Sequence, residues 1–291
     1  MKTALSTTAQ ARMQRVKAYL PESDRFRERF GLKPDHEALI ELGAWYQPPA
    51  WAAGAVGVID ACFLFDAVAC LRPAKILELG VASGGSTSVL LRAMHHAGLA
   101  LIDDDERPAV RSFDLHPMCY SDRSKPVGSA VFEMAPDLAH GVEVRSGVTS
   151  LDLNPTLAGE NFPLAFIDAN HQHPWPTLDI LALLPALAPG AWVVLHDIDL
   201  PAAAERYERT HNTKVHWHDH GAKHLFDAWP FEKIRGDAEA DNIGLVRLPD
   251  PAPTLAELRL ALAPSINKPW ETDPGERGRS ILTGSPSEGG R

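Results

Sequence analysis

The chain has 291 residues, of which 45 % are hydrophobic and 23 % are charged, and its formal net charge is −10. These proportions are ordinary for a globular protein, and the acidic excess argues against a protein that binds nucleic acid through its phosphates. The three cysteines, Cys62, Cys70 and Cys119, form no CxxC motif, so we expect no disulfide framework.

The N-terminal sequence shows no sign of export or membrane attachment. Residues 1–20 lack the continuous apolar core of a signal peptide, and no apolar run is long enough to span a bilayer. We therefore expect a soluble, cytoplasmic protein with no membrane partner.

Residues 1–70 are predicted to be helical. Residues 7–20 mix charged and apolar positions at helical spacing, residues 49–71 form a long Ala-rich run, and the pair Pro48-Pro49 separates the two. We interpret this region as a helical cap that serves as a lid or as the contact of a homodimer.

From Lys75 onward, short apolar strands alternate with helices. We predict strands at 75–79, 109–115, 142–147, 164–168 and 191–197, and helices at 86–97, 128–141, 177–190 and 201–210. Such alternation indicates an α/β protein, with a parallel sheet covered by helices on both faces. Strands at 231–236 and 242–249 are joined by a loop too short for a crossover helix, so they should pair antiparallel. Beyond residue 250 we expect one helix, 255–263, and a mobile tail over residues 271–291.

The segment ELGVASGGS, residues 78–86, joins the first strand of this pattern to its first helix. Its glycines, Gly80, Gly84 and Gly85, permit a tight bend that a ligand can approach closely, and Ser86 is a candidate N-cap. Ala82 stands where the dinucleotide motif GxGxxG requires glycine, and no GK[ST] follows. Glu78 would repel a pyrophosphate and attract a cationic ligand that carries an amino group and a sulfonium.

The bend resembles motif I of class I S-adenosylmethionine (SAM) methyltransferases. Residues 166–197, FIDANHQHPWPTLDILALLPALAPGAWVVLHD, resemble the small-molecule O-methyltransferases of antibiotic biosynthesis, in which IDxxH follows the fourth strand and HD or DD ends the fifth. The resemblance implies a Rossmann-like fold over residues 71–250, with seven strands and an antiparallel last strand. It also implies that SAM is the cofactor, held by Glu78, Gly80, Ala82, Ser83, Gly84 and Ser86, with its adenine beside Gly147, Val148 and Thr149.

Two positions compete for the second cofactor-binding acid, which ends the second strand and binds the ribose. Asp103 to Asp105 lie nearer the usual spacing, and Asp114 lies further along the chain. We favour Asp114, because a strand at 99–103 would leave no crossover helix before the strand at 109–115. The acidic run is then expected to be a solvated loop.

Ionisable residues follow the fourth and fifth strands, whose carboxyl ends share one edge of the sheet. They are Asp168, Asn170, His171, His173, His196, Asp197 and Asp199. In one chemistry, Asp168 and Asp197 bind Mg²⁺ or another divalent cation, with Asn170 or Asp199 completing the set. Ile198 stands where metal-dependent relatives commonly place a second Asp or Asn. In the other chemistry, His171 or His173 is the general base, with Asp168 and His196 as catalytic neighbours.

A second histidine cluster lies at His216, His218 and His220. In a strand, this alternation would place three imidazoles on one face, where they could bind Zn²⁺. The alternative is a solvent-facing or substrate-lining segment. Three tryptophans, Trp175, Trp217 and Trp229, are candidates for apolar walls of the substrate mouth or for core packing.

We therefore expect a SAM-dependent methyltransferase that acts on a small-molecule acceptor, at a hydroxyl oxygen rather than at nitrogen. The alternatives are a hydroxylase-like enzyme of the same fold, a nicotinamide oxidoreductase, and a non-catalytic SAM-binding partner subunit. Glu78 and the missing GxGxxG argue against the oxidoreductase. The ionisable centre at Asp168, His171 and Asp197 argues against the partner subunit.

Overall fold

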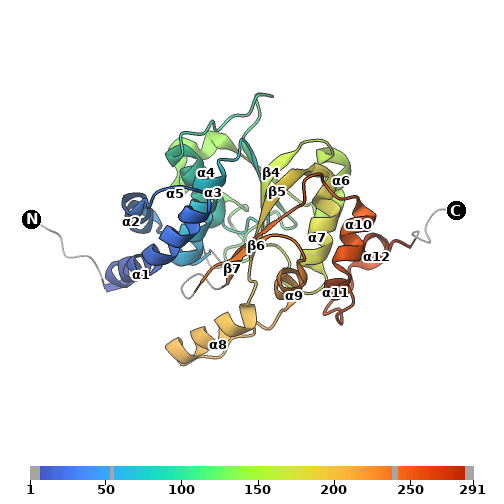
Figure 1. The fold of residues 1–291 in the computed structure, drawn as a ribbon. Coiled ribbons are helices and arrows are strands. Elements are labelled where there is room, and N and C mark those ends of the chain that lie inside the picture. The colour runs from blue at the N-terminus through green and yellow to red at the C-terminus, as the bar shows by residue number, and fades with distance from the viewer. Residues whose placement is uncertain (1–6, 53–55, 238–241, 286–291) are drawn as a thin grey trace, which may run out of the picture.

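The computed structural model describes residues 7–52, 56–237 and 242–285, and its centre is a seven-stranded sheet (Figure 1). The strand order is β3-β2-β1-β4-β5-β7-β6. The strands are β1 (Ile76–Leu79), β2 (Val110–Asp114), β3 (Val142–Ser146), β4 (Phe162–Ile167), β5 (Leu187–His196), β6 (Lys233–Arg235) and β7 (Ile243–Arg247). β1 to β5 pair in parallel, while β7 pairs antiparallel with both β5 and β6. The predicted fold class, with its antiparallel last strand, is confirmed.

Helices cover both faces of the sheet, as Figure 1 shows. One layer contains α1 (Thr7–Arg29), α2 (His36–Trp45), α3 (Val58–Leu71), α4 (Gly85–His96) and α5 (Ser129–Met134). The other contains α6 (Ser150–Leu157), α7 (Trp175–Leu183), α9 (Gly221–Ala228), α10 (Leu255–Ala261), α11 (Ala263–Ile266) and α12 (Gly275–Thr283). α8 (Leu200–His211) projects below the sheet.

Side chains alternate in direction along each strand, so the hydrophobic core lies in two halves, one on each face of the sheet. In β1, Ile76 packs in the cluster with α1 to α4, while Leu77 and Leu79 pack in the cluster with α6 and α7. Successive side chains of a strand point to opposite faces. Because both faces are buried, β1 is an almost continuous apolar run, and its one acid, Glu78, is completely buried.

Several predicted elements differ from the structure at prolines. The helix predicted at 128–141 ends at Met134, and Pro136–Gly141 forms a 3-10 helix, since proline lacks the N–H that would continue the helix. The helix predicted at 177–190 ends at Leu183, and Pro189 and Gly190 belong to β5. The long helix predicted from residue 49 begins at Val58, and residues 53–55 lie outside the described residues.

The C-terminal region is more ordered than its composition suggests. Residues 275–283 form α12, whose Leu282 is buried, so the expectation of a mobile tail is wrong there. Gly278 packs so closely on α7 that a Cβ would lie 2.9 Å from Leu178 Cδ2. The rest of the predicted tail, residues 286–291, lies outside the described part of the chain. Helices α2, α6, α9 and α11 were not predicted either.

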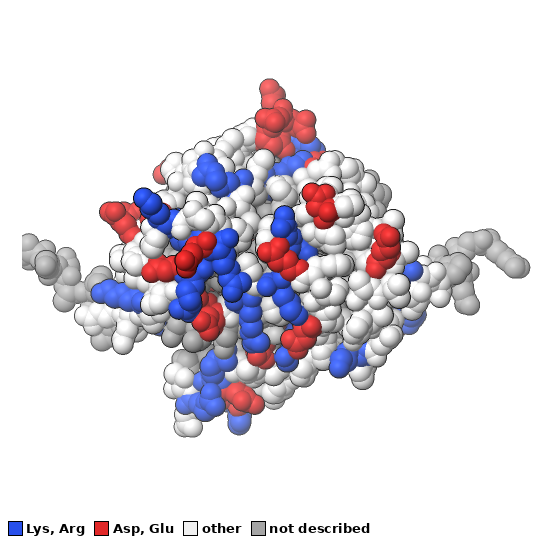
Figure 2. Space-filling model, in the orientation of Figure 1, with Lys and Arg blue, Asp and Glu red and all other residues white. Residues whose placement is uncertain are grey.

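Charged side chains of both signs are interspersed on the face around β6 and β7 (Figure 2). Arg235 of β6 pairs with Asp199, and Arg247 of β7 pairs with Glu232. Within the described residues, no helix is both long enough and apolar enough to cross a bilayer.

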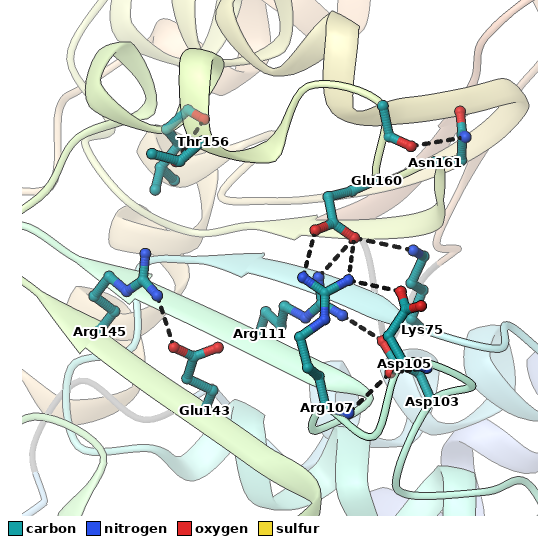
Figure 3. A network of polar contacts seen from close by, with 12 residues as sticks. Lys75, Asp103, Asp105, Arg107, Arg111, Glu143, Arg145, Thr156, Glu160 and Asn161 are labelled. Carbon is teal, nitrogen blue, oxygen red and sulfur yellow. Dashed lines mark hydrogen bonds and ion pairs between the residues drawn. The ribbon is translucent and has the colours of Figure 1, made fainter.

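A network of charges lies at the opposite edge of the sheet from the carboxyl ends of the parallel strands (Figure 3). Glu160 accepts hydrogen bonds from Lys75 Nζ at 3.2 Å and Arg107 Nη1 at 2.7 Å, and lies 2.8 Å from Arg111 Nη1. Arg111 is only 2 % exposed and also pairs with Asp103. The expectation of a solvated acidic run is therefore wrong for Asp103, which is 8 % exposed.

We expect Glu160→Gln to lower the free energy of unfolding by about 3 kcal/mol at neutral pH, because it leaves buried Arg111 under-compensated. Burial alone would raise the pKa of Glu160, but its hydrogen bonds from Arg107, Arg111 and Lys75 outweigh burial and lower that pKa from 4.5 to about 2. A carboxyl group whose pKa is lower in the folded state stabilises above its unfolded pKa and loses that contribution on acidification. Urea unfolding should show the difference between the two proteins shrinking from about pH 4.5 towards pH 2. A difference that does not change with pH would contradict this account.

Candidate active site

A cavity of about 1490 Å³ opens at the carboxyl ends of β1, β2, β4 and β5. Open α/β sheets bind ligands at this edge. Most of the predicted site residues line this cavity: Gly80, Ala82, Ser83, Ser86, Asp114, Val148, Thr149, Asp168, Asn170, His171, His196 and Asp197. Glu78, Gly84, His173 and Asp199 are not part of the cavity wall.

The glycine bend lies directly on the end of β4. Gly80 has φ of 91°, and a Cβ on it would lie 2.1 Å from the backbone oxygen of Asp168. Only glycine combines this conformation with so close an approach. The bend therefore fixes the position of Asp168 relative to the cavity.

Asp114 ends the second strand and holds the bend from the other side. Its Oδ2 accepts hydrogen bonds from the backbone N–H groups of Val81 at 2.9 Å and Ala82 at 3.0 Å. Its Oδ1 accepts from His116 N at 2.8 Å. The placement of the second strand before Asp114 is confirmed, and Asp103 lies at the far edge of the sheet.

Glu78 is buried behind the bend and is not part of the cavity wall. Three hydroxyls donate to its carboxylate: Ser86 Oγ at 2.6 Å, Thr87 Oγ1 at 2.7 Å and Ser112 Oγ at 2.5 Å. Burial raises the pKa of Glu78 to about 7, although these hydrogen bonds oppose the shift. Ser86 lies within the first turn of α4, whose N-cap is Gly84, so the N-cap prediction is wrong. Its hydroxyl instead connects Glu78 to the cavity wall.

The acidic centre forms where β4 and β5 end. Asp168, His171 and Asp197 each offer one ligand atom, and these atoms lie within 4.8 Å of one another. His171 Nδ1 lies 3.2 Å from Asp197 Oδ2. His196 Nδ1 lies 3.1 Å from Asp168 Oδ1 and 3.4 Å from Asp197 Oδ1. Asn242 Nδ2 donates to Asp197 Oδ1 at 2.6 Å and fixes that carboxylate.

A third carboxylate, which the sequence interpretation missed, comes from the N-terminal helices. Asp60 of α3 lines the cavity, and its Oδ2 lies 3.5 Å from His196 Nε2. Asp60 occupies the first turn of an otherwise apolar helix, where an acid is favoured by the helix dipole alone. No spacing or motif in the sequence could have shown whether Asp60 belongs to the cavity or only stabilises the start of α3.

Carboxylates therefore surround the His196 imidazole on both ring nitrogens. Burial lowers the pKa of His196, but Asp168 and Asp197 outweigh burial and hold that pKa well above its usual value. Burial likewise opposes the charge on Asp197, yet His196 lowers the pKa of Asp197 below its usual range. These carboxylates therefore favour the protonated form of His196.

Three other candidates, Asp199, His173 and Asn170, have surroundings that differ from those of the acidic centre. Asp199, proposed as a metal ligand, accepts a hydrogen bond from Arg235 Nη2 at 2.7 Å and is not a member of the ligand group. His173, proposed as a base, is buried with its ring centroid 5.2 Å from that of His224, and burial lowers its pKa to about 4. Asn170 lines the cavity but uses Oδ1 to accept from Gln172 N at 3.0 Å.

The three alternating histidines do not form a zinc site. Residues 213–220 are not a strand, and His220 Nδ1 lies 2.9 Å from Glu271. Among the described residues, only Asp168, His171 and Asp197 form a group able to hold a metal ion. Trp217 and Trp175 line the cavity, whereas Trp229 is buried in the core.

Comparisons with solved structures give similar proteins of low identity. The O-methyltransferase of Bacillus cereus in complex with SAH is 21 % identical, with 80 % of this chain and 98 % of that chain covered and a TM-score of 0.44. The Streptomyces achromogenes O-methyltransferase TomG, in complex with SAM, is 23 % identical, with 76 % and 93 % covered and a TM-score of 0.43. The SAH-bound methyltransferase of Podospora anserina is 14 % identical, with 85 % and 99 % covered and a TM-score of 0.47. No curated protein matches the chain.

The match to a protein family covers the part of the chain that forms most of the site. Residues 77–198, from β1 to the end of β5, match a family model described as a methyltransferase domain. This range includes the glycine bend, Asp114, His171 and the carboxylates Asp168 and Asp197. This part of the chain is therefore similar to a methyltransferase domain, in agreement with the enzyme class that the resemblance implied.

Proposed function

We propose that this chain transfers the methyl group of SAM to a hydroxyl oxygen of a small-molecule acceptor. The observation that carries the proposal is that the glycine bend and the acidic centre of the methyltransferase domain open into one cavity. Because this cavity is large, a cofactor on the bend and an acceptor beside it can be held together. Holding both reactants in line supplies much of the rate of a displacement reaction.

The cofactor would lie along the bend. Ser86, backed by Glu78, would meet its cationic methionine end, while Asp114 would face the ribose and Val148 and Thr149 the adenine. Glu78 then acts through Ser86 and not by contact. Thr149 also caps α6, where its backbone N–H and hydroxyl donate to Asp152 at 2.9 and 2.8 Å, so its position is fixed before a ligand binds.

The acidic centre has donors that fit a divalent cation. Carboxylates suit Mg²⁺ and Mn²⁺, and imidazole suits transition metals. Asp168 and Asp197 would be ligands, and His171 would be the third where Ile198 supplies no donor. A bound cation would lower the pKa of an acceptor hydroxyl. One imidazole cannot be a metal ligand and a general base at the same time. If no cation binds, His171 would therefore be the base that accepts the proton of the acceptor hydroxyl.

The acceptor side of the cavity would be formed by elements outside the family match. Arg15 of α1 and Asp60 of α3 line it from the N-terminal region, while Tyr207 and Trp217 line it from α8 and the loop that follows. Residues 1–70 are thus a cap over the acceptor, residues 71–250 the SAM-binding domain, and residues 251–291 a C-terminal appendage.

The test is methyl transfer from labelled SAM to a panel of hydroxylated and aminated small molecules, with and without chelator. We expect a labelled O-methyl product whose formation falls in chelator and recovers with Mg²⁺ or Mn²⁺. Full activity in chelator, lost in His171→Ala, would assign His171 as the base. SAM binding with no product from any acceptor would favour a non-catalytic SAM-binding subunit, and an oxidised product would favour a hydroxylase-like enzyme.

Asp114→Ala should weaken S-adenosylhomocysteine binding by about tenfold or more, because it removes a charged acceptor from two backbone N–H groups of the bend. Asp104→Ala, in the exposed acidic loop, is the matched control and should leave affinity unchanged. Calorimetric titration of both variants measures the difference. Equal affinities would show that the Asp114 carboxylate does not support the cofactor site.

A further inference from the structure

We propose that Glu271 is a positioning residue that fixes the loop carrying His171. Glu271 lies between α11 and α12, outside residues 77–198 of the family match. It connects two loops of the cavity wall, residues 168–174 after β4 and residues 213–220 before α9. The cation part of this inference rests on the function proposed above, whereas the loop contacts do not.

The first loop is held at His173 through both the backbone N–H and the backbone carbonyl of that residue. Glu271 Oε2 accepts a hydrogen bond from His173 N at 2.7 Å. In return, the backbone N–H groups of Glu271 and Thr272 donate to His173 O at 2.8 and 3.1 Å. These three bonds fix the backbone two residues after His171, and His173 itself is fully buried.

The second loop is held by the same carboxylate. His220 N donates to Glu271 Oε1 at 3.1 Å, and His220 Nδ1 lies 2.9 Å from that oxygen. The next residue, Gly221, begins α9 and donates its N–H to His171 O at 2.9 Å. A Cβ on Gly221 would lie 2.6 Å from this same oxygen, so the two loops are in direct contact at His171.

These contacts fix the backbone that carries the His171 ring. Its Nδ1 lies 3.2 Å from Asp197 Oδ2, and Trp175, directly after the first loop, and Trp217 of the second also line the cavity. A group that orients a metal ligand from behind typically contributes about 10- to 100-fold to metal affinity. Loss of the Glu271 carboxylate should therefore disturb the cation site and leave the cofactor bend, on β1 and β2, unchanged.

The experiment compares the full-length chain with Glu271→Ala and with the matched control Glu276→Ala, an exposed glutamate in the first turn of α12. Three quantities are measured: hydrogen exchange of peptides spanning 168–176 and 213–221, the Kd for Mn²⁺, and the Kd for S-adenosylhomocysteine. For Glu271→Ala we expect faster exchange in both peptides, Mn²⁺ affinity reduced about tenfold, and cofactor affinity within about twofold. Glu271→Gln keeps one acceptor oxygen, so its exchange rates and Mn²⁺ affinity should lie between those of the parent and of Glu271→Ala. Glu276→Ala should match the parent in all three measurements.

Unchanged exchange in the two peptides would overturn the proposal, as would faster exchange spread over the whole sheet, which would indicate general destabilisation. Faster exchange with unaltered Mn²⁺ affinity would overturn the link to His171. A parent protein that binds S-adenosylhomocysteine but no Mn²⁺ would reject the cation part of the proposed function. Exchange in the two peptides would then still decide whether Glu271 fixes the loop.

Discussion

Gly80→Ala is expected to lower the free energy of unfolding by about 4 kcal/mol and to abolish S-adenosylhomocysteine binding. The new Cβ would lie 2.1 Å from the Asp168 oxygen, 2.5 Å from its carbonyl carbon and 2.8 Å from Ala169 Cα. These are backbone atoms of the two residues that follow β4, and they cannot move aside as a side chain can. The φ of 91° adds strain of its own. Urea denaturation and calorimetric titration measure the two losses.

Gly159→Ala is the matched control for this substitution. Gly159 has a similar φ of 85°, but a Cβ there would meet no atom within 4 Å. It should therefore cost only the backbone strain, about 1–2 kcal/mol, and leave cofactor binding intact. Similar losses in the two variants would show that backbone conformation alone, and not the close approach to β4, determines the cost.

The second large effect is expected at the acidic centre. Asp168→Asn keeps the size of the side chain but removes a charge from the ligand group and from the pair with His196. We expect the rate of methyl transfer to fall by about 10²-fold or more, with Mn²⁺ binding lost. Affinity for S-adenosylhomocysteine should change by no more than about threefold, because the proposed cofactor site depends on Asp114 and Ser86 and not on Asp168.

Asp199→Asn provides the comparison for Asp168. Asp199 lies two residues after Asp197, but its carboxylate pairs with Arg235 instead of joining the ligand group. Its replacement should leave Mn²⁺ affinity close to that of the parent. Equal loss in both variants would indicate a general effect of negative charge near the site, and an Asp168→Asn variant with full activity would remove the acidic centre from the mechanism.

The sheet and the residues at its active edge were predictable because each depends on local pattern. Short apolar runs separated by helices fit only a mainly parallel sheet, and the carboxyl ends of its strands meet at one edge. Asp168 and Asp197 were therefore expected to lie close together, and they do. The same topological reasoning selected Asp114, because parallel strands require a crossover helix between them.

Side-chain direction was not predictable where it depends on a neighbouring strand. The register pairs Glu78 with Ser112 of β2, and the hydroxyls of Ser112, Ser86 and Thr87 fix its carboxylate, which is not part of the cavity wall. An acid at the end of a strand can face a ligand or the core, and sequence spacing is the same in both cases. The direction of the Asp199 side chain was equally unpredictable, because its partner Arg235 belongs to β6, far from it in the sequence.

Contacts between distant segments account for the remaining differences. Asp60 reaches His196 only because α3 packs on the sheet, and Glu271 meets His173 across 98 positions of sequence. The polar composition around residues 271–285 suggested disorder, yet Leu282 and Gly278 give α12 a surface that fits α7. Conversely, the alternating histidines at 216–220 suggested a strand, but this segment has no partner in the described sheet.

The proposed function requires that the glycine bend holds the methyl donor. This requirement can be tested by calorimetric titration of the purified chain with S-adenosylhomocysteine and, separately, with NADH. We expect saturable binding of S-adenosylhomocysteine that is weakened in Asp114→Ala, and no binding of NADH. Saturable NADH binding with no heat from S-adenosylhomocysteine would contradict it.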